Sequence, residues 1–196
     1  MPYDGDPDHP IVDCPWEFDI DLFSYHINPV DAHHSYIDLT LRRERTVRRL
    51  RFLGPRHLQI EKGFPTPTRG LCILDVRSRQ LEGIGVRVAD FESSLGAITF
   101  WAREVIDLDA LKPSYKRGDR VVMRKHGDWK AEARATIIRG GRARTIYDGT
   151  VHMEYVIKFD KHQADLTDES AGLAIEYEGT TVLEEDIRLL ATTDHS

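Results

Sequence analysis

The sequence predicts a mainly β protein made of two small domains, and three observations support that prediction. Short runs of β-branched, aromatic and alternating apolar residues recur along the chain, separated by Gly, Pro, Asp or charged turns. Helical patterns are scarce, and we expect only single helical turns at residues 78–82 and 105–111. The chain has 196 residues, of which 40% are hydrophobic, so it can bury one large core or two small ones.

The first domain is expected over residues 16–111 as an antiparallel β-sandwich or open barrel. An acidic, Pro-rich segment, residues 1–15, precedes it and has little to bury, so we expect a poorly ordered leader. Runs with strand spacing lie at residues 37–41, 46–52, 58–60, 70–76, 84–88 and 97–102. The charged residues 42–45 are expected to form the hairpin turn between the first two runs. Pro113 ends the domain, because it excludes helical geometry from Lys112.

The second domain is expected over residues 112–190, followed by a short tail at 191–196. Its β runs lie at residues 115–123, 135–138, 154–160 and 180–190, and residues 139–144 and 162–172 are interpreted as loops. Its opening Gly-Asp-Arg-Val, residues 118–121, and its closing Val-Leu-Glu-Glu-Asp-Ile-Arg, residues 182–188, resemble SH3-like barrels of the Tudor and KOW type. That resemblance implies a small, strongly bent barrel that binds a ligand and catalyses no reaction.

Four segments of the first domain resemble all-β immunity proteins of bacterial polymorphic-toxin systems. These segments are residues 57–64, 73–76, 79–83 and 96–102. The resemblance implies a cytosolic, acidic, non-catalytic chain that masks a secreted toxin domain. The formal net charge of −6 agrees with it, because an acidic protein captures a basic partner faster and more strongly.

The same net charge disfavours a dedicated nucleic-acid binder, but the charges are unevenly distributed. Residues 116–144 contain ten Lys or Arg against three Asp or Glu, whereas residues 148–188 contain three against eleven. Two interpretations stay open: a mixed, solvated barrel surface, which is the simpler one, and a one-sided basic patch. The residues expected to contact a ligand are Arg124, Lys125, Trp129, Arg139, Arg142, Arg144 and Tyr147.

A cage for a methylated cation, as in Tudor-type sites, requires three or four converging aromatic side chains. The second domain offers Tyr115, Trp129, Tyr147, Tyr155, Phe159 and Tyr177. Tyr155 and Phe159 share a strand face with Ile157. We therefore expect most of these aromatics to be packing residues.

Patterns for metal, cofactor and catalytic sites are missing from the sequence. Cys14 and Cys72 have neither metal nor disulfide-framework spacing, and His33 and His34 would point to opposite faces of a strand. No nucleophile elbow and no phosphate-binding Gly-rich loop occurs, so we expect no enzyme, cofactor or metal. An arginine cluster without interleaved aromatics is expected to form a salt-bridged solvent face. Its members are Arg42, Arg43, Arg45, Arg48, Arg49 and Arg51.

Two functional hypotheses follow. The first is a non-catalytic protein-binding protein, an immunity factor that neutralises a bacterial toxin by direct binding. The alternative is a nucleic-acid-associated SH3-like barrel that uses a basic patch on its C-terminal domain. The sequence has no apolar run of membrane-spanning length and no signal-peptide pattern, so we expect a cytoplasmic protein without membrane contact.

Overall fold

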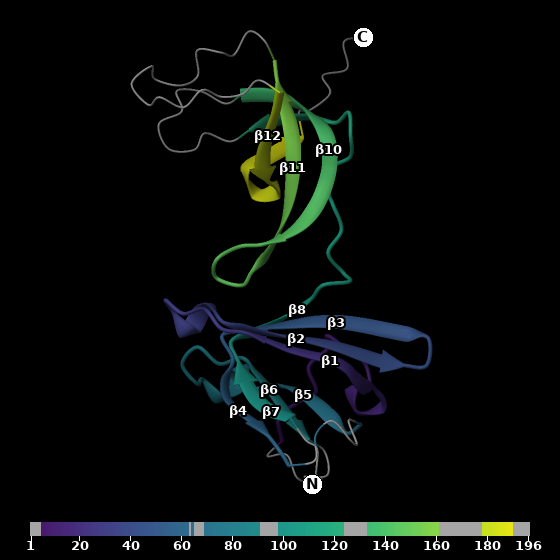
Figure 1. Cartoon of the computed structure of the whole chain (residues 1–196), viewed down its shortest axis with the longest axis vertical. Coiled ribbons are helices and arrows are strands. Elements are labelled where there is room, and N and C mark those ends of the chain that lie inside the picture. The colour runs from purple at the N-terminus through teal and green to yellow at the C-terminus, as the bar shows by residue number, and fades with distance from the viewer. Residues whose placement is uncertain are drawn as a thin grey trace. The chain divides into compact units, whose positions relative to one another are not determined.

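The computed structural model describes residues 5–62, 64, 69–90, 98–123, 133–160 and 178–189. As predicted, the protein is mainly β: these residues form three antiparallel sheets, and their helical structure is limited to 3-10 turns (Figure 1). No helix within these ranges is long and apolar enough to cross a membrane. The chain divides into two compact units, which we call the first unit (Met1–Ala110 with Tyr147–Thr150) and the second unit (Leu111–Ile146 with Val151–Ser196).

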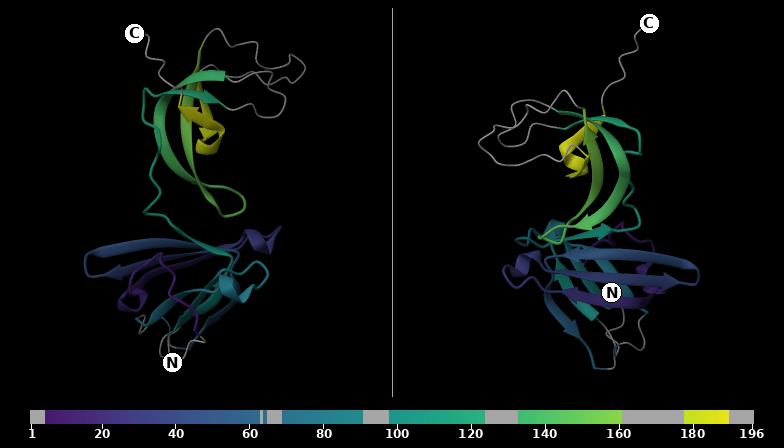
Figure 2. Two further views of the ribbon diagram at one scale, coloured as in Figure 1. Left: turned by 180° about the vertical axis from the view of Figure 1, so that it is seen from behind. Right: turned by 45° about the horizontal axis from the view of Figure 1, so that its top comes forward.

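The first unit contains two four-stranded antiparallel sheets that enclose a common core (Figures 1 and 2). One sheet has the order β1-β2-β3-β8, with β1 Asp19–His26, β2 Tyr36–Arg43, β3 Thr46–Leu53 and β8 Glu104–Asp107. The other has the order β4-β7-β6-β5, with β4 Arg56–Ile60, β5 Leu71–Asp75, β6 Val86–Asp90 and β7 Ile98–Ala102. Rings from the two sheets meet edge to face: the centroids of Phe52 and Phe100 are 5.1 Å apart. A core shared by two sheets is the arrangement of a β-sandwich.

Six of the strands in this unit, β2 to β7, fall where the sequence predicts them, and β2 and β3 form the expected hairpin. Strands β1 and β8 were not predicted. The helical turn expected at 105–111 is wrong over its first half, because Glu104–Asp107 pairs with β3. Val105 and Ile106 are β-branched, and the edge of β3 supplies their hydrogen-bond partners. The turn expected at 78–82 corresponds to a 3-10 turn, η3, at Arg77–Arg79.

Residues 5–15 are held against the first unit, although the sequence analysis expects them to be poorly ordered. The His9 amide donates to the Ile73 carbonyl at 2.8 Å, and the Asp75 amide donates to the Pro7 carbonyl at 2.9 Å. These bonds extend the second sheet beyond its edge strand β5. Val12 is buried in the core, so the segment supplies apolar packing as well as main-chain pairing.

A buried arginine joins three strands on the outer face of the β1-β2-β3-β8 sheet. The Arg51 side chain donates to both carboxylate oxygens of Asp38 at 2.8 Å and is 6% exposed. Its guanidinium lies 3.9 Å from the ring centroid of Tyr36, and the Tyr36 ring stacks on His26 at 4.4 Å. This bidentate pair has the planar geometry that only arginine offers to a carboxylate.

The expected salt-bridged arginine face is confirmed for most of its members. Ion pairs join Arg42 to Asp21, Arg43 to Glu17, Arg48 to Asp107, Arg49 to Asp109 and Arg51 to Asp38. These pairs compensate the positive charge on β2 and β3 within the first unit.

The second unit contains one five-stranded sheet with the order β12-β11-β10-β9-β13. Its strands are β9 Arg120–Met123, β10 Ala133–Thr145, β11 Val151–Phe159, β12 Glu178–Leu183 and β13 Ile187–Leu189, and a 3-10 turn, η6 Glu184–Asp186, joins the last two. In the part of the chain that the structure describes, no pairing links β12 to β13, so the sheet is not closed into a barrel. The loop expected at 139–144 is wrong, because these residues continue β10 and pair with β11. The loop expected at 162–172 lies outside the described residues.

Replacement of Arg51 by Ala is expected to destabilise the first unit by about 3–5 kcal/mol, because it removes the bidentate partner of Asp38 and leaves that carboxylate with only the His26 ring, 3.8 Å away. Urea unfolding followed by circular dichroism measures the change. The matched control is Arg42→Ala on the same sheet, whose pair with Asp21 is solvent-exposed and whose loss is expected to have a much smaller effect. Equal destabilisation by the two substitutions would contradict the stabilising role assigned to the buried Arg51–Asp38 pair.

Candidate functional site

The solvent face of the second unit's sheet collects basic side chains from four strands. Alternate residues of a strand share one face, so Glu154, Val156 and Lys158 of β11 lie together, opposite the buried Tyr155 and Ile157. Residues paired across neighbouring strands share the same face. The pairs on this side are Arg142↔Glu154, Arg139↔Val156, Thr136↔Lys158, Thr136↔Arg120, Arg134↔Val122 and Arg188↔Val122.

We call this surface the arginine face. Its cationic members are Arg120, Arg134, Arg139, Arg142, Arg144, Lys158 and Arg188. Ion pairs with neighbouring carboxylates include those of Arg120, which donates to Asp160 at 2.8 Å, and of Arg144, which donates to Glu154 at 2.9 Å. Among the described residues, Arg139 and Arg142 have no ion pair, and both are exposed. The face therefore carries more positive than negative charge and presents free guanidinium groups to solvent.

The structure brings together three of the seven residues that the sequence analysis selected for binding: Arg139, Arg142 and Arg144. Arg124, Lys125 and Trp129 lie outside the described residues. Tyr147 belongs to the first unit, where it is 77% exposed and its ring lies edge-on to His34, with centroids 5.2 Å apart. Of the two interpretations left open by the sequence, the strand register favours the one-sided patch for these arginines.

Tyr115, Tyr155 and Phe159 are used for packing, as expected, whereas Tyr147 is 77% exposed and is not a packing residue. Tyr155 and Phe159 are buried in the core, and Tyr115 is partly buried with its ring edge-on to Tyr155 at 5.4 Å. Trp129 and Tyr177 lie outside the described residues. None of the three described rings lies free to form a wall of a methylated-cation cage.

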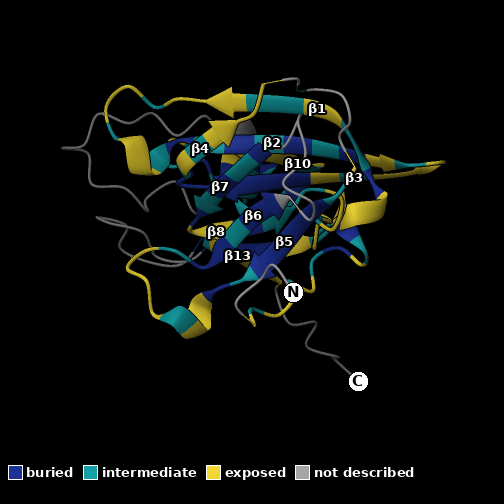
Figure 3. Cartoon of the chain, turned by 90° about the horizontal axis from the view of Figure 1, so that it is seen from below, coloured by how far each residue is buried: buried dark blue, intermediate teal, exposed yellow. Residues whose placement is uncertain are grey.

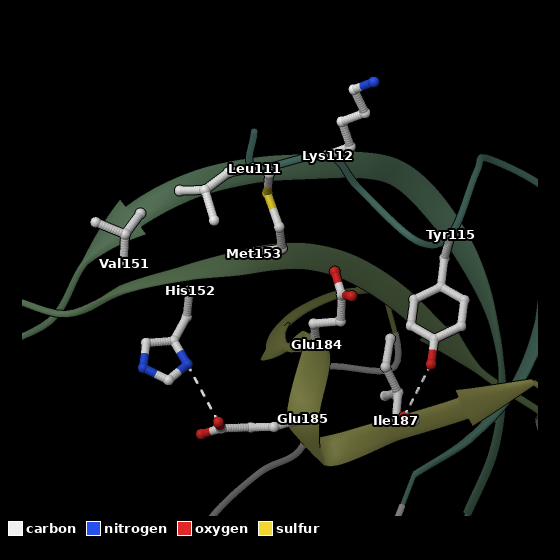
Figure 4. A pocket seen from close by; sticks show the side chains of 9 residues that line it. All are labelled: Leu111, Lys112, Tyr115, Val151, His152, Met153, Glu184, Glu185 and Ile187. Atoms are coloured by element: carbon white, nitrogen blue, oxygen red, sulfur yellow. Dashed lines mark hydrogen bonds and ion pairs between the residues drawn. The ribbon is translucent and has the colours of Figure 1, made fainter. Parts of the chain in front are cut away.

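An open pocket of about 440 Å³ lies on the second unit near the η6 turn (Figure 4). Apolar and aromatic side chains make up much of its lining, and its polar groups are one histidine, one lysine and two glutamates. The lining residues are Leu111, Lys112, Tyr115, Val151, His152, Met153, Glu184, Glu185 and Ile187. The sequence analysis selected none of these residues for binding. Their only sequence signal is the Glu184-Glu185 pair, an ordinary feature of an acidic chain.

Glu184 occupies the centre of this pocket and is held by neutral donors. The Tyr155 hydroxyl donates to one carboxylate oxygen at 2.7 Å, and the Ser114 hydroxyl donates to the other. Burial and the hydrogen bond to Glu184 raise the pKa of Tyr155 to about 12, so the phenol remains a neutral donor at physiological pH. In the described part of the chain, no cation lies within ion-pair distance of Glu184, whereas Glu185 pairs with the His152 Nδ1 at 3.1 Å.

The first unit has a different exposed feature along its edge strand β1. Large apolar side chains from one segment reach solvent there, and Figure 3 shows most of β1 in the colours of exposed and half-buried residues. We call these residues the β1 surface: Trp16, Leu22, Tyr25, Ile27 and Val30. The sequence of the first unit contains 19 Asp and Glu against 13 Lys and Arg, whereas the second unit has 14 of each. The β1 surface therefore belongs to the unit that carries the net negative charge.

The described residues contain no group of three His, Cys, Asp or Glu side chains placed to hold a metal ion. Cys14 and Cys72 are both free thiols. No protein-family model matches the chain, and neither the curated proteins nor the solved structures contain a match.

Gly141 lets β10 pass close to the residues that shape the pocket. A Cβ at this position would lie 2.6 Å from the Pro113 Cβ and 3.0 Å from the Tyr155 hydroxyl. Gly141→Ala is therefore expected to destabilise the second unit by about 1–3 kcal/mol, because the added methyl displaces packed atoms. Thermal unfolding measures the change, and Gly140→Ala is the matched control, since a Cβ there meets no atom within 4 Å. Comparable losses in the two variants would contradict the steric explanation.

Proposed function

We propose that this chain is a non-catalytic binding protein that captures another protein through the β1 surface of its first unit. The observation that carries the proposal is the concentration of exposed apolar side chains: nine of the ten large ones in the described residues lie in the first unit, five of them between Trp16 and Val30. Exposed apolar side chains that recur along one segment are typical of interaction surfaces, and here they lie on both sides of the edge strand, Leu22 opposite Thr40 and Tyr25 opposite Ile37. β1 is also the edge strand of its sheet among the described residues, and an edge strand is the position at which a strand of a partner can pair.

The partner proposed is a basic protein. The first unit has six more acidic than basic residues, and opposite net charges accelerate and strengthen association. A toxin-neutralising immunity factor is the specific form of this proposal, supported by the resemblance of the first domain to all-β immunity proteins. The proposed SH3-like character of the second unit is supported by its connectivity: four strands form a meander, and after a 3-10 turn the fifth returns to pair with the first.

The double variant Leu22→Ser/Ile27→Ser is expected to weaken partner binding by about tenfold or more, because it removes apolar contacts at the interface without changing the charge of the surface. Affinity capture with the full chain followed by mass spectrometry identifies the partner, and calorimetry with the purified partner measures the change. Leu81→Ser is the matched control, since Leu81 is 41% exposed in the same unit but outside the β1 surface. Equal weakening by both variants, or a chain that captures no protein and protects against no toxin, would count against the proposal.

A second candidate function is nucleic-acid association through the arginine face. The supporting observation is the gathering of seven cationic side chains on one side of the sheet, of which Arg139 and Arg142 have no ion pair with any residue that the structure describes. Among the described residues this face has no exposed aromatic side chain for base stacking, which favours contact with the phosphate backbone over single-strand recognition.

For this second candidate, duplex DNA or RNA affinity is expected to fall steeply with salt, and Arg139→Ala and Arg142→Ala are each expected to reduce the log–log slope by about one unit. Fluorescence anisotropy with a labelled duplex measures the slope. Arg69→Ala in the first unit, where Arg69 is exposed and paired with Asp19, serves as the control and is expected to leave the slope unchanged. Undetectable binding at about 50 mM salt would exclude the candidate.

A further inference from the structure

We infer that the pocket beside η6 is a receptor for a basic side chain, lysine or arginine, presented by the protein partner. This inference rests on the proposed function, because it assigns the second unit a share in binding the same basic protein. It starts from the chemistry of the pocket, which combines an apolar lining with a carboxylate at its centre (Figure 4).

The first argument is the uncompensated charge of Glu184. Its three contacts are the Tyr155 hydroxyl at 2.7 Å, the Ser114 hydroxyl, and the Ser114 amide at a long 3.5 Å. All three donors are neutral, and no cation among the described residues pairs with this carboxylate. When a half-buried carboxylate has no cation beside it, a positively charged ligand stabilises it more than another neutral donor does.

The second argument is the lining around Glu184. Leu111, Val151, Met153 and Ile187 offer apolar contacts suited to the aliphatic stem of a long basic side chain. Figure 4 shows the Lys112 ammonium pointing away from the Glu184 carboxylate, so the chain's own lysine does not fill the site. The volume of about 440 Å³ exceeds what one side chain needs, which leaves room for the adjoining main chain of a partner.

The third argument concerns Glu185 and His152 at the rim of the pocket. Glu185 is the more exposed glutamate, with 59% of its side chain accessible, and its one charged contact is the His152 ring. An incoming cation can therefore contact both neighbouring glutamates of η6 without breaking a buried ion pair. A neutral ligand gains only the apolar contacts, so the pocket discriminates by charge.

The test uses the full chain and blocked amino acids as probes. N-acetyl-lysine methylamide and N-acetyl-arginine methylamide are titrated into the isotope-labelled protein, and the methyl resonances of Met153, Val151 and Ile187 report binding. We expect dissociation constants on the order of 1 mM for a single side chain, and no saturable binding of the neutral N-acetyl-norleucine methylamide. Equal binding of the norleucine compound would overturn the inference.

Variants separate the pocket from other acidic surfaces. Glu184→Gln is expected to weaken the lysine probe by about tenfold or more, since it removes the central charge but keeps an acceptor for Tyr155. Glu185→Gln is expected to weaken binding of the lysine probe by a smaller factor. Because Glu185 is more exposed, this loss of affinity does not depend on packing in the core. Glu82→Gln, at an exposed carboxylate of the first unit, is the control and is expected to leave binding unchanged. Unchanged affinity in both pocket variants would refute the assignment.

Two further outcomes distinguish this inference from the proposed function. If the lysine probe binds and depends on Glu184 while the full chain captures no basic protein, the pocket is assigned correctly and the proposed function fails. If a partner is captured but its affinity is unaffected by Glu184→Gln and Glu185→Gln, the proposed function holds and the inference fails. Tighter binding of spermidine than of the blocked lysine would show that the ligand is a free polyamine, which contradicts a protein source.

Discussion

The pairing of β10 with β11 is the interaction on which the second unit depends most. β10 has two register shifts, between Ile137 and Arg139 and between Arg139 and Arg142. In a regular strand, odd- and even-numbered arginines would point to opposite faces, and one set would enter the core. The two shifts place Arg139, Arg142 and Arg144 on the solvent side while Ile137 stays buried. The bulged pairing of β10 with β11 is therefore the reason that its last three arginines join the arginine face.

The two units differ in how far carboxylates compensate their positive charges. In the first unit, arginines of β2 and β3 are matched by acids from neighbouring segments, and the most buried of them, Arg51, is held by a bidentate carboxylate and a ring. In the second unit, the arginine face has fewer carboxylates than cations. The net charge of −6 thus describes the first unit, where it arises, but not the second unit, where acidic and basic residues are equal in number. Long-range electrostatic attraction therefore favours a basic partner for the first unit, whereas the arginine face of the second unit favours an anionic one.

The sequence predicted elements whose pattern is local and missed those that depend on distant partners. Strands β2 to β7 have apolar residues at regular spacing, so alternation was sufficient to find them. β1 was missed because its pairing with β2 shifts near Asp21 and leaves Leu22 exposed. The prediction ended β10 too early, because Gly140-Gly141 has the composition of a turn. No local sequence pattern predicts the pocket. Its central contacts join Ser114, Tyr155 and Glu184, which are far apart in sequence and meet only through η6.

The contacts at η6 also tie the segment before β9 to the last strand of the second unit's sheet. Ser114 binds Glu184, and the Tyr115 hydroxyl donates to the Ile187 carbonyl at 3.1 Å. A change in η6 therefore acts on the segment that enters the sheet and on the strand that closes it at the same time.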